Sequence, residues 1–253
     1  MSESRTPRTS RLATTVNPKI VATVTGLLGF LLAILTPLFA RLERELPPIV
    51  DAITASLGPQ IVKLISGLGK AHVRLRSANL DECEALLLTG QADFSITYSL
   101  DSDNSDHRAA MTMEAFIANE RLIPVYGTQS VKEMLWRFHT GSLDVIAYPA
   151  DVFLGIVVER QIFPRLERQC RLNIVAETAL TLAAMQMASA GVGVAWVPEA
   201  LAQADLRDER LSDLSGQLGG LEMQIVARKR AEDAPDLHAR IWNALSRAGA
   251  VVP

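Results

Sequence analysis

Six hydroxyl-bearing residues in this sequence stand where a small ligand could be bound. Thr54 and Ser56 follow a short apolar run and precede a periodic apolar segment, which predicts a strand-to-helix junction. Backbone N–H groups at such a junction are unpaired and attract anions. The other four stand at the ends of predicted strands or at the start of a predicted helix: Thr97, Tyr98, Tyr148 and Thr178. We expect these groups to bind a small carboxylate by hydrogen bonds, with helix capping or packing as the alternative for each.

The residues that usually carry catalysis or bind metal are not arranged for either task. The four histidines, His72, His107, His139 and His238, show no i, i+4 pairing, and no G-x-S-x-G motif or Ser/His/Asp order occurs. Cys83 has acidic neighbours, which should raise its pKa and make it a poor nucleophile. Gly191-Val-Gly193 follows a predicted helix and lacks the third glycine of a dinucleotide fingerprint. We therefore expect no enzyme activity, no metal site and no cofactor.

Composition and charge describe a folded protein without a broad cationic surface. The chain has 253 residues, of which 49% are hydrophobic and 21% charged, with a formal net charge of −3. Four of the basic residues lie within the first 19 positions, so the remainder is more acidic than the whole and is unsuited to nonspecific binding of phosphate backbones. Two cysteines, Cys83 and Cys170, are too few for a structural zinc site, and we expect free thiols in a reducing compartment.

Short strands and amphipathic helices alternate after residue 46. In the first set we expect strands over 49–53, 72–76 and 92–97 and helices over 57–68 and 81–90. A strand–helix–strand–helix–strand order with short loops predicts right-handed crossovers and a parallel sheet.

A second set of elements follows the first. The expected strands cover 122–126, 145–148, 172–176, 193–197 and 223–227, and the expected helices cover 131–138, 157–162, 179–190 and 237–248. Two similar sets predict two α/β lobes, with a ligand in the cleft between them at the carboxyl ends of the strands.

Three stretches together resemble the effector-binding domain of LysR-type transcriptional regulators. They are HVRLRSANLDECEALLLTGQADFSITY (72–98), LIPVYG (122–127) and ETALTLAAMQMASAGVGVAWVPEALA (177–202). The first carries the family's Gly-x-x-Asp turn at Gly90 and Asp93, and the third matches the family pattern at Gly191, Gly193, Val197 and Pro198. The resemblance covers about 48–253, which is the size of that whole domain.

The resemblance implies a two-lobed, type 2 periplasmic-binding-protein-like α/β fold with mainly parallel sheets. It assigns 46–121 with 222–253 to lobe I and 122–221 to lobe II. It also implies that Thr54 and Ser56 contact the carboxylate of a small anionic or aromatic effector, and that the protein is a homo-oligomer in the cytoplasm. A membrane-tethered solute-binding protein of the same fold is the alternative.

The first 45 residues differ from what the family has there. Residues 1–19 form a basic tail that we expect to be flexible, and 20–45 predict an apolar helix. Its 21 uncharged residues at 20–40 would span a bilayer or form a buried or dimer-interface helix. Nothing in 1–47 reads as a recognition helix, so we expect a truncated or atypical regulator that binds DNA only if a helix-turn-helix is supplied elsewhere.

Overall fold

The long strand β2 (Thr112–Gly127) organises the sheet of this protein. The computed structural model describes residues 51–69, 72–100, 111–231 and 236–248. β2 pairs over its first eleven residues with β7 (Leu221–Arg230), and β1 (Ser95–Ser99) lies on the other side of β7. β5 (Ala195–Pro198) and β6 (Leu211–Asp213) pair with the end of β2. These five strands form one sheet in the order β1-β7-β2-β5, with β6 also on β2.

The prediction of mainly parallel sheets is wrong for this sheet, in which every pairing is antiparallel. Among the described residues, parallel pairing joins β3 (Ser142–Ala147) to β4 (Arg171–Glu177), and β3 also bridges to Val194 just before β5. The sequence indicated a strand only at 122–126, because the polar residues in the first half of β2 obscure its alternation. Because β2 is 16 residues long, β7 can run beside it in the opposite direction, and the two strands together connect both halves of the domain.

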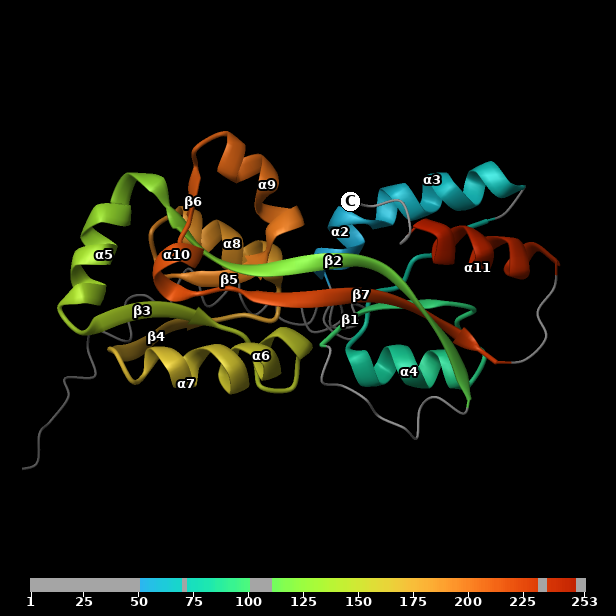
Figure 1. Cartoon of the computed structure of the whole chain (residues 1–253), viewed down its shortest axis with the longest axis horizontal. Helices are drawn as coiled ribbons and strands as arrows, with labels where there is room; N and C mark the ends of the chain where they lie inside the picture. Colours follow the sequence, from blue (N-terminus) through green and yellow to red (C-terminus); the bar gives the residue numbers. More distant parts are fainter. Residues whose placement is uncertain (1–50, 70–71, 101–110, 232–235, 249–253) are drawn as a thin grey trace, which may run out of the picture. The chain divides into compact units, whose positions relative to one another are not determined.

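The helices flank this long pair of strands at its two ends. They are α2 (Asp51–Ser56), α3 (Gly58–Leu68), α4 (Leu80–Leu88), α5 (Val131–His139), α6 (Phe153–Val157), α7 (Phe163–Leu166), α8 (Thr181–Ser189), α9 (Glu199–Arg207), α10 (Ser215–Leu218) and α11 (Asp236–Ala248). A 3₁₀ turn, η1 (Thr128–Ser130), precedes α5, and a π-helical turn, η2 (Val158–Ile162), joins α6 to α7. Figure 1 shows α3, α4 and α11 with β1 at one end of the β2–β7 pair, and α5 to α10 with β3 to β6 at the other.

Two strands predicted near the start of the domain are not strands. Residues 51–53 of the expected strand 49–53 begin α2, because Ala52 and Ala55 favour helix and the Leu57 N–H donates to the Ile53 carbonyl at 2.8 Å. Residues 72–76 are extended but pair with no strand among the described residues. Their alternation has no buried face, since only Val73 of the five is even half-buried.

Most other predicted elements are confirmed with shifted ends. The expected helices 57–68 and 131–138 correspond closely to α3 and α5, whereas 157–162 falls within α6 and η2. Asn79 occupies the N-cap position of α4 without a side-chain hydrogen bond to the helix, and Gly90 after the helix has a φ of 72°, the left-handed conformation that ends helices. The apolar runs at 122–126 and 193–197 lie in β2 and β5.

The core is centred on β5 and on the second half of β2. All four residues of β5 are buried, since β2 lies on one side and the β3 bridge on the other. The Trp196 indole is fully buried, donates to the Gly219 carbonyl at 3.3 Å and packs edge-on against Phe163. A strand buried on both sides reads as a continuous apolar run, which is why the sequence identified it.

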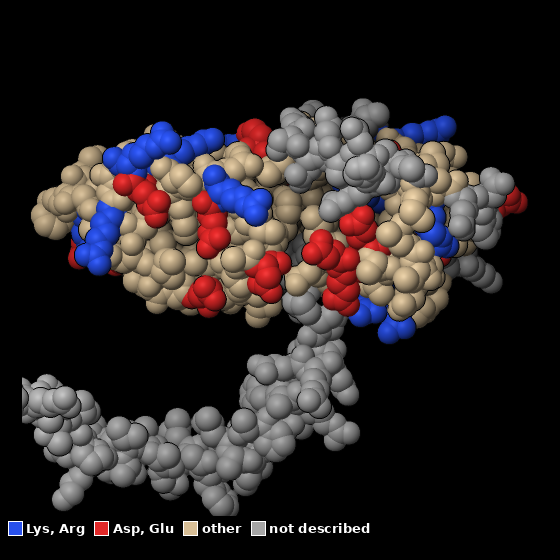
Figure 2. All heavy atoms as spheres, turned by 90° about the horizontal axis from the view of Figure 1, so that it is seen from below, with Lys and Arg blue, Asp and Glu red and all other residues tan. Residues whose placement is uncertain are grey.

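Residues Pro48–Pro253 form one compact unit. Among the described residues no helix combines the length and apolarity needed to cross a bilayer, and the predicted tail 1–19 and helix 20–45 lie outside them. On the face drawn in Figure 2, acidic and basic side chains both occur and neither kind covers it.

Candidate functional site

Tyr98, in β1, carries a buried hydroxyl group that has no hydrogen-bond partner among the described residues. The side chain is 3% exposed and stacks on Phe153 at the start of α6, with ring centroids 6.0 Å apart. Burial raises the pKa of Tyr98 well above its usual value, and the nearby Glu120 and Tyr148 raise it further. The phenol is therefore neutral and offers an O–H donor in a position that excludes water. A buried polar group without a partner costs stability, and a ligand acceptor would remove that cost.

Tyr148 follows β3 and is also buried, but its hydroxyl is satisfied. It donates to the Trp196 carbonyl at 2.9 Å, and the Thr181 side chain hydrogen-bonds to it. Burial raises the pKa of Tyr148, and the Thr181 hydrogen bond offsets only part of that effect. Thr181 is the first residue of α8 and is buried as well.

Glu120, in β2, places a carboxylate near Tyr98 and at the start of α9. Its Oε1 accepts hydrogen bonds from the backbone N–H groups of Arg121 at 3.0 Å and Ala200 at 3.3 Å. The side chain is 5% exposed, and burial raises its pKa although these backbone donors act in the opposite direction. Glu120 therefore supplies an acceptor to the first turn of α9, where backbone donors are unpaired.

Five side chains lie together within the apolar core, four of them with polar groups: Tyr98, Glu120, Tyr148, Phe153 and Thr181. We call these five residues the tyrosine cluster. They come from five different elements or junctions, brought together where β1 meets α6 and where α8 contacts both β2 and β3. Among the described residues, the Tyr98 hydroxyl is the group of this cluster that lacks a hydrogen-bond partner. The cluster contains no pair of an activated nucleophile and a base.

Three of the five cluster members were not predicted. Glu120 lies between Asn119 and Arg121 in a stretch that resembles a surface loop, and only its place directly before the apolar run at 122–126 could have indicated a strand residue. The sequence predicts a helix that begins after Thr178, which leaves Thr181 inside its first turn and gives no reason to select it. Nothing in the sequence around Phe153 distinguishes it from other apolar residues.

Gly155 fixes the approach of α6 to this cluster. A Cβ atom at this position would collide with the carbonyl oxygen of Pro149, so α6 can pack this closely on the chain after Tyr148 only with glycine there. The contact holds Phe153 against Tyr98.

Thr97 is buried but lies on the other face of β1 from Tyr98. Neighbouring residues of a strand point to opposite faces. The Thr97 hydroxyl accepts a hydrogen bond from Arg228 at 2.9 Å, and Arg228 also pairs with Glu114 across the sheet. Thr97 therefore belongs to a row of hydrogen-bonded polar side chains that runs across β1, β7 and β2. It is not part of the tyrosine cluster.

The other predicted residues, Thr54, Ser56 and Thr178, lie in or next to helices that contact or carry members of the cluster. Thr54 and Ser56 belong to α2, which contacts α8 and α9, and neither caps α3, whose N-cap is Leu57. The Thr178 N–H donates to the Ala147 carbonyl at 3.1 Å, and its hydroxyl accepts from the Leu180 N–H at 3.1 Å. Thr178 thus continues the β3–β4 ladder and forms a local turn before α8. A ligand-binding role for any of the six residues stays a prediction.

The described residues contain no group of three or more potential metal ligands. Both cysteines are free, as predicted. The pKa of Cys83 is raised, chiefly by burial and secondarily by Glu82, so the expected direction is right and the expected main cause is not.

Comparison with known proteins finds a family model that matches part of this chain. Residues 157–247 match the sequence model of the LysR substrate binding domain. This part of the chain is similar to that domain. The LysR resemblance and its type 2 periplasmic-binding-protein-like fold are thereby confirmed, and so is the assignment as an effector-binding domain. The same match does not favour the tethered solute-binding alternative.

Solved LysR-type structures share the fold at low sequence identity. The apo regulatory domain of HypT from Salmonella typhimurium is 19% identical, with a TM-score of 0.67 over 80% of this chain and 93% of that one. Full-length HypT, described as a hypochlorite-specific LysR-type regulator, is 20% identical, with a TM-score of 0.67 over 92% and 79%. Vibrio fischeri DarR in complex with DNA is 16% identical, with a TM-score of 0.61 over 91% and 78%. No curated protein sequence matches the chain.

Proposed function

We propose that this domain senses a small organic carboxylate, with an aromatic or apolar body, that binds at the tyrosine cluster and controls a LysR-type transcription regulator. The observation that carries the proposal is the buried Tyr98 hydroxyl, which lies beside the Phe153 ring and has no hydrogen-bond partner in the described part of the chain. A carboxylate accepting from Tyr98 would satisfy this donor, and the ligand body would contact the aromatic rings.

The position of the cluster suits a switch. It joins β1, at one end of the long β2–β7 pair, to elements at the other end. A ligand held by Tyr98 and by α8 together would favour one relative position of these elements, which is how effector binding could be transmitted to a homo-oligomer.

The family supports the broader terms of the proposal. LysR-type regulators are not enzymes: they bind small-molecule effectors, oligomerise and bind DNA. Among the structural relatives, HypT's regulatory domain has a form with bromide bound, and LysG of Corynebacterium glutamicum has a form with the effector Arg bound. For this chain we propose a cytoplasmic location and a homo-oligomer, with DNA binding only if a helix-turn-helix is supplied elsewhere.

The test is a thermal-shift screen of small organic acids against the full chain, followed by calorimetry of each hit on Tyr98→Phe. The variant should lose about 10- to 100-fold in affinity, the usual effect of one hydrogen bond to a charged group. The matched control is Ser246→Ala on α11, which removes another buried hydroxyl that has no partner within the described ranges, and it should leave affinity unchanged. Equal affinity of wild type and Tyr98→Phe for every hit would contradict the proposal.

A further inference from the structure

A second site is indicated by a cavity that none of the tyrosine cluster residues lines. Its volume is about 760 Å³, within the range of small-molecule sites. The walls come from α2, α3, the 72–76 segment, α4, β1 and α11. The apolar lining is extensive and includes Ile61, Ile65, Leu86, Phe94, Ile241 and Leu245.

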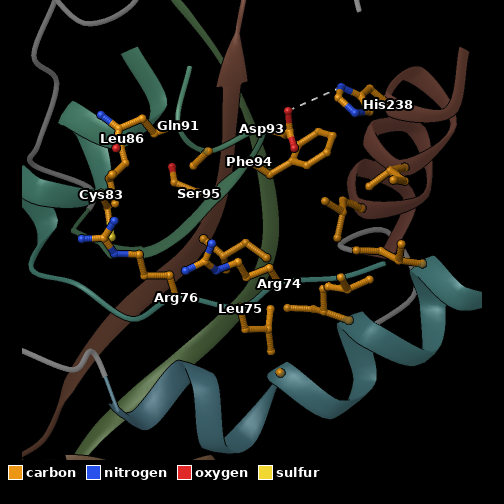
Figure 3. Close-up of a pocket in the computed structure, with 18 of the residues that line it drawn as sticks. Arg74, Leu75, Arg76, Cys83, Leu86, Gln91, Asp93, Phe94, Ser95 and His238 are labelled. Atoms are coloured by element: carbon orange, nitrogen blue, oxygen red, sulfur yellow. Dashed lines mark ion pairs between the residues drawn. The ribbon is translucent and has the colours of Figure 1, made fainter. Parts of the chain in front are cut away.

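Charge is placed unevenly around this cavity. Arg74 and Arg76 approach it from the extended 72–76 segment, and the Asp93–His238 pair lies on another side, nearer α11 (Figure 3). Arg76 is engaged by Glu82 at 2.7 Å. The Arg74 guanidinium, in contrast, has no hydrogen bond or ion pair within the described part of the chain, and it lies beside apolar walls.

An unpaired cation beside an apolar cavity selects one class of ligand. A carboxylate would pair with Arg74, whereas the acidic Asp93 disfavours an anionic head on its own side of the cavity. The aliphatic body of the ligand would then extend between α3 and α11, where the lining is apolar. The Cys83 thiol also lines this cavity, where it donates a hydrogen bond to the Ala78 carbonyl at 3.5 Å. Binding of the carboxylate on Arg74 involves no covalent bond to this thiol.

We propose that this cavity binds an aliphatic monocarboxylate, with its head on Arg74 and its chain between α3 and α11. The site is separate from the tyrosine cluster and does not depend on the function proposed above. It gives the domain a second small-molecule input.

The probes are hexanoate, octanoate and 1-octanol, titrated into the full chain by calorimetry. Octanoate should bind at least about tenfold more tightly than octanol, because only the acid pairs with Arg74. Each added methylene should increase affinity about fourfold until the cavity is filled.

Substitutions inside and outside the cavity test where the two probes bind. Arg74→Gln should weaken octanoate about tenfold or more and leave octanol unchanged, whereas Arg168→Gln, an exposed arginine outside the cavity, should change neither. Ile61→Phe adds volume inside the cavity and should weaken both probes. Tyr98→Phe should leave octanoate binding intact, which separates this site from the tyrosine cluster.

Three outcomes would overturn the proposal: no octanoate binding at millimolar concentration, equal affinities for Arg74→Gln and Arg168→Gln, or loss of octanoate binding in Tyr98→Phe. In the last case the acid would occupy the tyrosine cluster, and the function proposed there would gain a ligand.

Discussion

Tyr98 carries a hydroxyl group whose burial costs the folded protein stability. This hydroxyl has no hydrogen-bond partner among the described residues, so its removal takes away an unfavourable contribution to stability. We expect Tyr98→Phe to melt at the wild-type temperature or slightly above it in the absence of ligand, as measured by differential scanning calorimetry. A melting temperature lowered by more than about 4 °C, roughly 1–2 kcal/mol in a domain of this size, would mean that the hydroxyl has a stabilising partner.

Glu120 makes a pH-dependent contribution to the free energy of unfolding, and the sign of that contribution follows from the burial of its carboxyl group. Burial raises the pKa of this carboxyl above the reference value of 4.5, so the unfolded chain loses the proton first as pH rises. Ionisation therefore destabilises the folded state from about pH 4.5 upward, and the penalty is complete above the folded pKa.

Glu120→Gln keeps an oxygen for the Arg121 and Ala200 N–H groups and removes the charge. We expect its melting temperature to rise relative to wild type between pH 4.5 and pH 7, and to be at least equal at pH 7. Glu159→Gln, on an exposed surface, is the control and should show no such trend. A wild type more stable than Glu120→Gln at pH 7 would contradict this account.

At the scale of elements, α6 depends on the absence of a side chain at Gly155. We expect Gly155→Ala to cost about 1–3 kcal/mol, because a Cβ would collide with the Pro149 carbonyl and displace Phe153. Chemical denaturation measures the loss. Gly216→Ala in α10 is the control, since no atom lies within 4 Å of the added Cβ. Equal stability of the two variants would show that α6 can move without cost.

Elements were predictable where one stretch of sequence determines them. The apolar run of β5 and the Gly191 that ends α8 are local signals, and both were interpreted correctly. The strand predicted at 72–76 failed, because alternation predicts a strand only when a neighbour and a buried face exist for it. The antiparallel course of β7 beside β2 is a long-range pairing that no local pattern specifies.

The candidate site was less predictable than the fold for the same reason. Tyr98 and Tyr148 were chosen because they end strands, and the structure couples them electrostatically. Thr97 was chosen on the same ground but faces the opposite side of β1, since the register decides which of two neighbours is inward. Glu120 and Thr181 join the cluster only through contacts between β2, α8 and α9.

At the scale of the whole molecule, residues Pro48–Pro253 contain the sheet, the core and both candidate sites. We therefore expect a variant lacking residues 1–45 to fold and to unfold cooperatively, with a melting temperature within a few degrees of the full chain. Circular dichroism with sedimentation analysis tests this. Aggregation of the truncated protein under conditions where the full chain remains dispersed would show that the apolar segment 20–40 belongs to the core.

Hydrogen–deuterium exchange on the full chain, with and without the tightest acid from the screen, tests the central claim most directly. Binding at the tyrosine cluster predicts slower exchange in 95–99, 148–157 and 181–185, which are the elements that carry Tyr98, Tyr148, Phe153 and Thr181. Protection confined to 58–65, 72–76 and 237–245 would place that ligand in the second cavity. That result, or no change in exchange near Tyr98, would contradict the assignment of the tyrosine cluster as the effector site.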